Sequence, residues 1–213
     1  CFSEAKKSGE KGFIPYIMGG DGGLDQLVPT IKYFERLEAS AIEIGIPFSD
    51  PVADGPSIQE AGLRALEQDV TLDDILNELR NTEEIIEIPL IMMTYANPVL
   101  RLGISTFAAK CREASISACI IPDVPLEEEQ MFKKELSKEG IVLIRLLPLT
   151  ANPTRMAKLC DGAEGFIYAV TVNGTTGEQA QLNDEAFKEQ ILQLKHNTDC
   201  PIYAGFGISN AKT

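Results

Sequence analysis

The 213-residue sequence lacks the features that mark several large classes of protein. It has no block of Lys and Arg and a formal net charge of -13, so non-specific binding to nucleic acid or to an anionic membrane surface is not expected. No apolar run approaches the roughly 20 residues of a membrane span. No secretory signal is visible, although the first residue is Cys and not Met, so we expect the true N-terminus to be missing. A small anionic substrate is still compatible with this charge, because backbone amides and helix termini bind phosphate locally.

Cysteine and histidine are also sparse. The five cysteines are scattered, odd in number and free of any CxxC pair, which is typical of reduced thiols in a cytosolic protein and not of a disulfide framework or a zinc site. The single histidine, His196, lies at the end of a predicted helix without neighbours at ligand spacing. The sequence therefore predicts a cytoplasmic protein with no metal site.

Strand-like and helix-like segments alternate along the chain, which predicts an α/β fold with a parallel sheet. The strand segments are near-continuous apolar runs, as expected for strands covered on both faces. Pro29 predicts a kink or a later start in the first helix. The predicted strands are 12–20, 41–48, 89–95, 118–124, 141–147, 165–171 and 201–205, and the predicted helices are 24–37, 57–68, 72–80, 105–114, 127–138, 153–159 and 184–195.

Such repetition allows a (β/α)8 TIM barrel or a doubly wound open sheet. The dinucleotide fingerprint GxGxxG after the first strand and the P-loop GxxxxGK[ST] are both absent. Polar loops rich in Gly and Pro follow strand after strand, which is typical of the catalytic face of a TIM barrel. They are predicted at residues 20–23, 48–51, 95–98, 122–125 and 173–177. Seven strands are predicted, and a closed barrel cannot leave the eighth position open. We therefore expect a single TIM-barrel domain over residues 1–213, lacking strand 8 and helices 7–8, and incomplete at the C-terminus and also at the N-terminus.

Glu43 is a carboxylate inside an otherwise apolar predicted strand. Period-two geometry places it with Ala41 and Gly45 on one face, opposite the isoleucines of the same strand. Burying an unpaired carboxylate costs several kcal/mol or raises its pKa, so such a group is usually kept where it has a partner or a function. The small neighbours leave space beside Glu43, and that space suggests a ligand. A structural Glu paired with an Arg or a backbone amide is the alternative.

Residues 42–56 (IEIGIPFSDPVADGP) closely match a family signature, and the chain is similar to the tryptophan synthase alpha subunit family. The likeness spans nearly the whole chain, through the segments 20–21, 95–98, 122–125, 176–177 and 205–209. It implies a (β/α)8 carbon–carbon lyase of L-tryptophan biosynthesis that splits indole-3-glycerol phosphate into indole and glyceraldehyde 3-phosphate. It further implies no cofactor in this chain and a heterotetramer of two alpha and two beta subunits, in which the beta subunit carries pyridoxal phosphate and consumes the indole.

The same resemblance implies roles for individual residues. Glu43 is the general acid/base and Asp54 the second catalytic carboxylate. The implied substrate-binding residues are Tyr95, Tyr168, Thr176, Gly177 and Gly207, and the implied partner interface is Pro47, Asp50, Pro51, Asn97, Asp123 and Pro125. The family takes half of its phosphate site from the loop after strand 8, so the chain as given is not expected to be active.

Each role has a structural alternative. Asp54 can be a turn residue in Ala-Asp-Gly-Pro, and Tyr168 can be core packing with a satisfied hydroxyl. The glycines can serve tight turns, and the loop prolines can stiffen their loops without touching a partner. Arg145, within strand 141–147, can pair with a buried carboxylate, and we assign it no catalytic role.

The chemistry can be argued from the residues as well. Cleaving a carbon–carbon bond beside a hydroxyl needs an electron sink, yet no predicted strand holds the Lys of a Schiff-base aldolase, and one His cannot form a metal cluster. An indole ring can itself accept the electrons of the broken carbon–carbon bond once its C3 carbon is protonated. Glu43 can supply that proton if burial raises its pKa, and Asp54 can accept the indole N–H and stabilise the cation.

Two other functions remain open at this point. One is another phosphate-binding TIM-barrel enzyme of aromatic amino-acid biosynthesis, whose relatives use Lys or Asp/Cys catalysts on strands. The other is a non-catalytic subunit that only regulates a partner. Glu43 and Asp54 argue against both.

Overall fold

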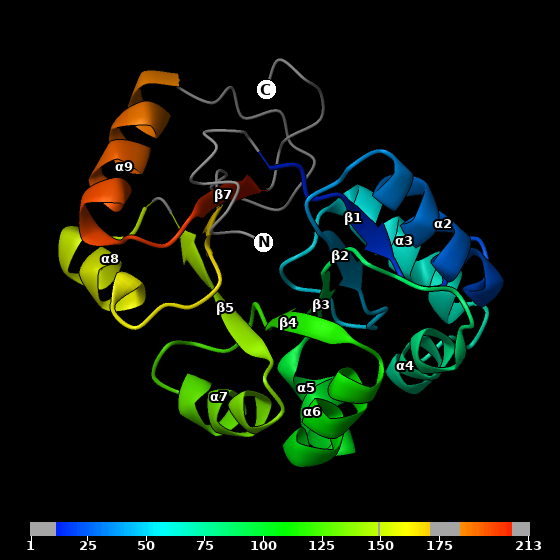
Figure 1. Ribbon diagram of the computed structural model, residues 1–213. Helices are drawn as coiled ribbons and strands as arrows, with labels where there is room; N and C mark the ends of the chain where they lie inside the picture. Colours follow the sequence, from blue (N-terminus) through cyan, green and yellow to red (C-terminus); the bar gives the residue numbers. More distant parts are fainter. Residues whose placement is uncertain (1–11, 149, 171–183, 206–213) are drawn as a thin grey trace.

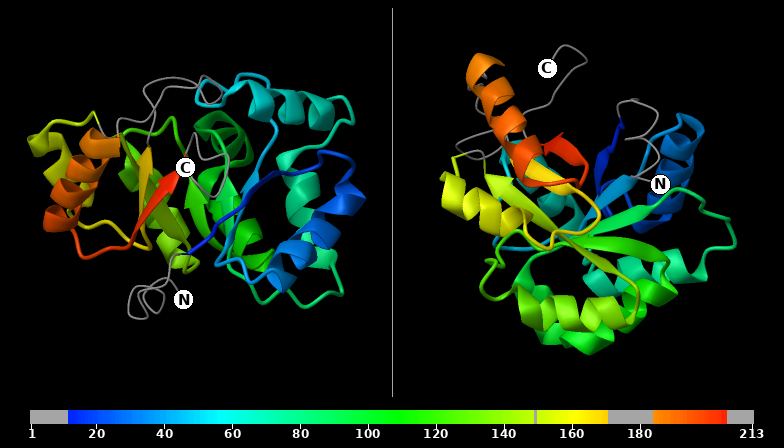
Figure 2. Two further views of the ribbon diagram at one scale, coloured as in Figure 1. Left: turned by 90° about the horizontal axis from the view of Figure 1, so that it is seen from above. Right: turned by 60° about the vertical axis from the view of Figure 1, so that its left-hand side comes forward.

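The computed structural model describes residues 12–148, 150–170 and 184–205. Within these ranges lies a sheet of parallel strands that are hydrogen-bonded in chain order, from β1 to β7. Figure 1 shows the strands in an arc at the centre of the molecule and the helices around the outside, and Figure 2 shows the same arrangement from two further sides. The predicted TIM-barrel type of fold is confirmed. The strands are β1 (Tyr16–Met18), β2 (Ile42–Gly45), β3 (Leu90–Met93), β4 (Ile116–Ile120), β5 (Val142–Pro148), β6 (Ile167–Val170) and β7 (Ile202–Gly205).

Every predicted helix is present within a few residues of its expected bounds. Pro29 acts as the sequence predicts: α2 has its late start at Leu27, after a 3-10 turn, and Pro29 lies in the first turn, where its missing N–H breaks no helical bond. The helices are η1 (Leu24–Gln26), α2 (Leu27–Arg36), α3 (Pro56–Leu66), α4 (Leu72–Asn81), α5 (Ala96–Leu102), α6 (Ile104–Glu113), α7 (Glu129–Lys138), α8 (Pro153–Cys160) and α9 (Asp184–Asn197).

Helix α5 corrects the sequence prediction, which treats residues 95–98 as a loop. The chain becomes helical at Ala96, so Asn97 and Pro98 lie in the first helical turn. Proline is tolerated there because the first N–H groups of a helix have no intrahelical acceptor. The Asp123 side chain supplies an acceptor for one of them, since its Oδ1 accepts the Ala96 N–H at 2.9 Å. The loop after β4 thus helps to fix the start of α5.

The alternation along the strands separates two apolar layers. Ile42, Ile44 and Ile46 pack outward in the cluster that β2 shares with helices such as α2, α4 and α6. Ala41 packs inward with residues from β3 to β6, including Ile91. Glu43 therefore lies on the inner face of β2, as its place in the alternation predicts.

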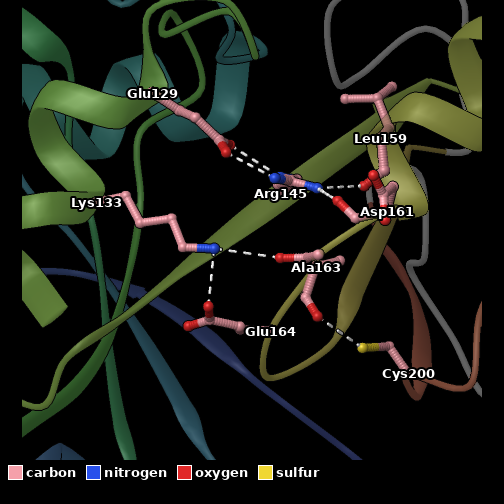
Figure 3. Close-up of polar contacts among 9 residues, drawn as sticks. Glu129, Lys133, Arg145, Leu159, Asp161, Ala163, Glu164 and Cys200 are labelled. Carbon is pink, nitrogen blue, oxygen red and sulfur yellow. Dashed lines mark hydrogen bonds and ion pairs between the residues drawn. The ribbon is translucent and has the colours of Figure 1, made fainter.

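The outer layer also contains a buried ion pair. Arg145 on β5 donates to both carboxylate oxygens of Glu129 on α7, at 2.8 and 2.6 Å. It also donates to the carbonyls of Leu159 and Asp161 at the end of α8, at 2.9 and 2.5 Å (Figure 3). The prediction that Arg145 pairs with a buried carboxylate is confirmed. Its position between the strand and two helices makes it a structural residue.

The state of the cysteines and the length of the apolar helices can also be read from the described residues. Cys111, Cys119, Cys160 and Cys200 are free thiols. No helix in the described part of the chain is both long and apolar enough to span a membrane.

Candidate active site

Glu43 is almost completely buried, with 3% of its surface exposed, on the inner face of β2. The hydroxyl of Tyr168, on β6, donates to Oε2 of Glu43 at 3.5 Å, although 125 residues separate the two in sequence. Burial raises the pKa of Glu43 to about 8, and the hydrogen bond from Tyr168 offsets only part of that rise. Glu43 is therefore mostly protonated near neutral pH and can donate a proton. Among the described residues it has no ion-pair partner.

Asp54 lies in the loop that joins β2 to α3. Its N–H donates to the carbonyl of Pro51 at 3.0 Å, and its carbonyl accepts from Gln59 Nε2 at 2.7 Å, which fixes the backbone. The hydroxyl of Tyr95 accepts the Ala53 N–H at 2.9 Å and lies close enough to the Asp54 carboxylate to lower its pKa. Burial raises the pKa of Asp54 to about 6, against the opposing effect of Tyr95. Asp54 is thus a turn residue and also a buried carboxylate that is mostly ionised at neutral pH.

A third tyrosine, Tyr16 on β1, belongs to this group and was not among the predicted site residues. The parallel register places Tyr16 directly beside Glu43. A Cβ atom added to Gly45 would lie 1.8 Å from the Tyr16 hydroxyl oxygen, so the hydroxyl occupies the place of a side chain at Gly45. The prediction that Gly45 leaves space for a ligand is wrong for that reason. The sequence did contain a signal for this contact. Gly45 lies on the same face of the strand as Glu43, and a glycine inside a strand often marks a place where another group approaches the backbone closely.

The structure also accounts for the two other predicted tyrosines. Tyr168 hydrogen-bonds to Glu43 and Tyr95 lies beside Asp54, so each predicted carboxylate has one of the predicted tyrosines as its neighbour. Gly205 at the end of β7 makes room for Tyr168, since a Cβ there would lie 2.2 Å from its hydroxyl oxygen. The predicted phosphate-site residues Thr176, Gly177 and Gly207 lie outside the described residues.

A cavity of about 410 Å³ opens beside the Asp54 loop. Ala53, the inward residues Ile144 and Leu146 of β5 and Val170 of β6 form one part of its wall, and outer-layer residues that include Leu143, Arg145 and Glu129 form another part. A largely apolar wall close to a few polar groups is the usual setting of a small-molecule site. This cavity adjoins the Asp54 loop through Ala53, and neither Glu43 nor Asp54 is among its lining residues.

The predicted partner residues follow β2, β3 and β4, so they gather at the carboxyl edge of the sheet. Asp50, Asn97, Asp123 and Pro125 are exposed, and Pro51 is half-buried. Pro47 is buried, which corrects the prediction that it faces a partner. Asn97 is presented by helix α5 and not by a loop.

The described residues contain no group of three or more His, Cys, Asp or Glu side chains placed to hold a metal ion. His196 lies in the last turn of α9, where the sequence predicts it.

Comparison with known proteins agrees with this arrangement. Residues 2–213 match the family described as tryptophan synthase alpha chain. The tryptophan synthase alpha chain of Oceanobacillus iheyensis is 46% identical over 202 residues, which cover 94% of this chain and 76% of the relative. That of Bacillus thuringiensis subsp. konkukian is 46% identical over 205 residues, covering 96% and 79%.

Solved structures show the same likeness. The tryptophan synthase subunit alpha of Legionella pneumophila has a TM-score of 0.86 at 33% identity, covering 97% of this chain and 76% of that one. A chain of the tryptophan synthase a2b2 complex of Pyrococcus furiosus, a structure described in terms of mutual activation, has a TM-score of 0.83 at 30% identity, covering 94% and 80%.

Proposed function

Because the chain belongs to the tryptophan synthase alpha chain family and shares its lyase role in tryptophan synthesis, we propose that Glu43 and Asp54 cleave indole-3-glycerol phosphate into indole and glyceraldehyde 3-phosphate. One observation supports this most strongly. Two buried carboxylates, each with a tyrosine as its neighbour, have different pKa values, about 8 for Glu43 and about 6 for Asp54. Near neutral pH one holds a proton and the other holds a charge, as acid/base chemistry requires.

The reaction uses the two groups in different roles. Protonated Glu43 gives its proton to C3 of the indole ring, and the ring becomes a cation whose charge spreads to its nitrogen. Ionised Asp54 accepts the indole N–H and stabilises that cation. The bond from C3 to the glycerol chain then breaks, its electrons return to the ring, and the hydroxyl proton passes to the Glu43 carboxylate. Glu43 ends the cycle protonated, so neither an external acid nor a cofactor in this chain is consumed.

The substrate-binding roles extend this proposal. Tyr168 orients the Glu43 carboxyl through their hydrogen bond, and Tyr95 holds Asp54 in the same way. Thr176, Gly177 and Gly207 would bind the phosphate through backbone amides.

The proposal includes a partner. We place a pyridoxal-phosphate beta subunit on the carboxyl edge of the sheet, at Asp50, Pro51, Asn97, Asp123 and Pro125, in a heterotetramer of two alpha and two beta subunits. The Pyrococcus furiosus relative is described as such a complex. A cytoplasmic location is part of the proposal, and the free thiols of the four described cysteines support it.

The structure offers physical arguments against the two other functions. A Schiff-base barrel enzyme needs a strand lysine, and the seven described strands contain none. A merely regulatory subunit has no need of a buried carboxyl with a raised pKa, which costs folding free energy at neutral pH.

The test is the rate of indole formation from indole-3-glycerol phosphate by the full-length protein, with and without the beta subunit. Glu43→Gln keeps the shape of the side chain but cannot exchange a proton, so turnover should fall by at least about a thousandfold while ligand binding persists. Glu60→Gln on the exposed face of α3 is the matched control and should retain full activity. Near-normal turnover by Glu43→Gln would refute the assignment.

A further inference from the structure

The buried side chain of Tyr95 links the end of β3 to the loop after β2. Its hydroxyl accepts the Ala53 N–H at 2.9 Å, and its ring lies beside that of Phe48, with the two ring centres 5.3 Å apart. Phe48 and Ala53 stand at the two ends of the segment that leads to Asp54. A shift of the Tyr95 side chain would therefore displace the Asp54 backbone with it.

Tyr95 is itself placed by the start of helix α5. It comes immediately before the first helical residue, Ala96, whose N–H has no acceptor inside the helix. Asp123, in the loop after β4, provides that acceptor: its Oδ1 accepts the Ala96 N–H at 2.9 Å. A carboxylate is a strong acceptor at this end of a helix, where the dipole is positive. Two hydrogen bonds of 2.9 Å thus lead from Asp123, through Ala96 and Tyr95, to the Asp54 loop.

We propose that Asp123 is a positioning residue for the reaction: it fixes the start of α5, and through the Tyr95 hydroxyl it holds the loop that carries Asp54. This inference rests on the proposed function of Asp54 and adds a residue to it. Asp123 contacts no reacting atom in this role. It lies on the exposed rim, where the resemblance implies a partner contact, but its carboxylate is already bonded within the chain.

The role predicts which kinetic constant changes. Asp54 stabilises a cation that forms during the reaction, so a displaced Asp54 loop should weaken binding of the transition state more than binding of the substrate. A variant that breaks the link should therefore lower kcat and leave KM nearly unchanged. A partner contact predicts a different result, namely normal cleavage by the alpha chain alone and weaker activation by the beta subunit.

The experiment measures kcat and KM for indole formation from indole-3-glycerol phosphate by the full-length protein without a beta subunit. Asp123→Ala removes the acceptor and should lower kcat by about tenfold, with KM changed less than about twofold. Asp123→Asn keeps an oxygen that can accept the Ala96 N–H and should retain at least about half of kcat. Asp74→Ala is the matched control, because Asp74 accepts the Thr71 N–H at 2.9 Å at the start of α4. It should keep full kcat.

Ala96→Pro breaks the same hydrogen bond from the donor side. Proline is accepted at the first position of a helix, and the residue before it must be extended, as Tyr95 already is. The variant leaves the charge of Asp123 in place, so it should lower kcat by the same factor, about tenfold. It also tests the link independently of whether Asp123→Ala folds.

A double-variant cycle tests whether Asp123 acts through Tyr95. Tyr95→Phe removes the hydroxyl that accepts the Ala53 N–H, so in its presence the link is already broken. Adding Asp123→Ala to Tyr95→Phe should therefore lower kcat by less than about twofold further, whereas independent residues would multiply their losses.

Three outcomes would each overturn the role of Asp123, even if Glu43→Gln is inactive. These are an unchanged kcat in Ala96→Pro, a loss in Asp123→Ala that is seen only with the beta subunit, and multiplied losses in the double variant. An active Glu43→Gln would instead refute the proposed function, whatever Asp123→Ala does.

Discussion

At the scale of single residues, the environment of each carboxylate decides its charge. Glu43 is enclosed by apolar strands and has one weak donor, so desolvation dominates and favours the neutral acid. Asp54 is less enclosed, lies just before the N-terminus of α3 and is bonded to Tyr95, all of which favour the anion. The carboxyl group is thus mostly a neutral acid at Glu43 and mostly an anion at Asp54.

This difference predicts the pH dependence of activity. The reaction needs Asp54 ionised and Glu43 protonated, so kcat/KM should be bell-shaped, with limbs near the pKa values of about 6 and about 8 and a maximum near pH 7. Initial rates of indole formation between pH 5 and 9 measure it. A rate that stays constant up to pH 9 would contradict a protonated Glu43, and a maximum below pH 5 would contradict an ionised Asp54.

Glu43 should also lower stability at high pH. Its folded-state pKa of about 8 exceeds the value of 4.5 for the unfolded chain, so the folded protein loses stability as pH rises from 4.5 through 8. Glu43→Gln removes this loss. The variant should therefore match the wild type near pH 4 and exceed it at pH 9, by up to about 5 kcal/mol in the free energy of unfolding. Urea unfolding at both pH values measures the difference, with Glu60→Gln as the control. Equal pH dependence in Glu43→Gln and wild type would show that Glu43 is not desolvated.

The position of Glu43 was predictable, but its neighbours were not. Alternation along β2 needs only local sequence, and it correctly places Glu43 inside. The contacts with Tyr168 and Tyr16 depend on which strands lie together and in which register, and no local pattern contains that information. Tyr16 in an apolar strand is typical of core packing, so its place beside Glu43 emerges only from the register of β1 and β2.

At the scale of helices and strands, the sequence predicts which elements exist better than it predicts where each one begins and ends. The predicted strand 41–48 exceeds the observed ladder Ile42–Gly45, because burial continues beyond the hydrogen-bonded part. Ile46 still donates to the carbonyl of Met93 at 2.9 Å, but Pro47 has no N–H to extend the ladder. Helix α5 was missed because Asn-Pro favours a turn in isolation, whereas here Asp123 on another loop accepts an N–H at its start.

The ion pair of Arg145 and Glu129 ties β5, α7 and α8 together and gives a prediction at this scale (Figure 3). Arg145→Met should destabilise the protein by about 3–5 kcal/mol, because it leaves the Glu129 carboxylate buried without a partner. Denaturant unfolding at pH 7 measures the loss. Replacing both residues, as Arg145→Met with Glu129→Leu, should recover most of it, since an apolar pair of similar volume needs no charge compensation.

Arg155→Met is the matched control for that experiment. Arg155 pairs with Glu127 on the surface, where solvent screens the attraction, so its loss should change stability little. If Arg145→Met were no more costly than Arg155→Met, the buried pair would not hold the helices to the sheet. If the double variant stayed as unstable as the single one, the loss would come from packing and not from the unpaired charge.

At the scale of the whole molecule, the two ends of the sheet have different tasks. The carboxyl ends of the strands carry Glu43, the Asp54 loop and the exposed partner residues, while the amino ends carry short connections such as the segment before β3. Glu35 of α2 accepts the N–H groups of Glu87 and Ile88, at 2.6 and 3.0 Å, and so anchors that segment. The proposed catalysis and partner binding therefore share one end, and the contacts at the other end serve stability.

This asymmetry predicts where a partner binds. Val52 is 66% exposed on the carboxyl-end loop beside Asp50 and Pro51, and Ile85 is 76% exposed at the amino end. A charge placed in a buried interface loses water without gaining a partner, so Val52→Asp should weaken binding of the beta subunit by at least about tenfold. Ile85→Asp changes the same kind of exposed aliphatic residue at the opposite end and should bind normally. Calorimetric titration of each full-length variant with the beta subunit measures both affinities, and the cleavage rate without beta subunit should be unchanged in either. Equal affinity of Val52→Asp and wild type, or a loss confined to Ile85→Asp, would place the partner elsewhere on the molecule.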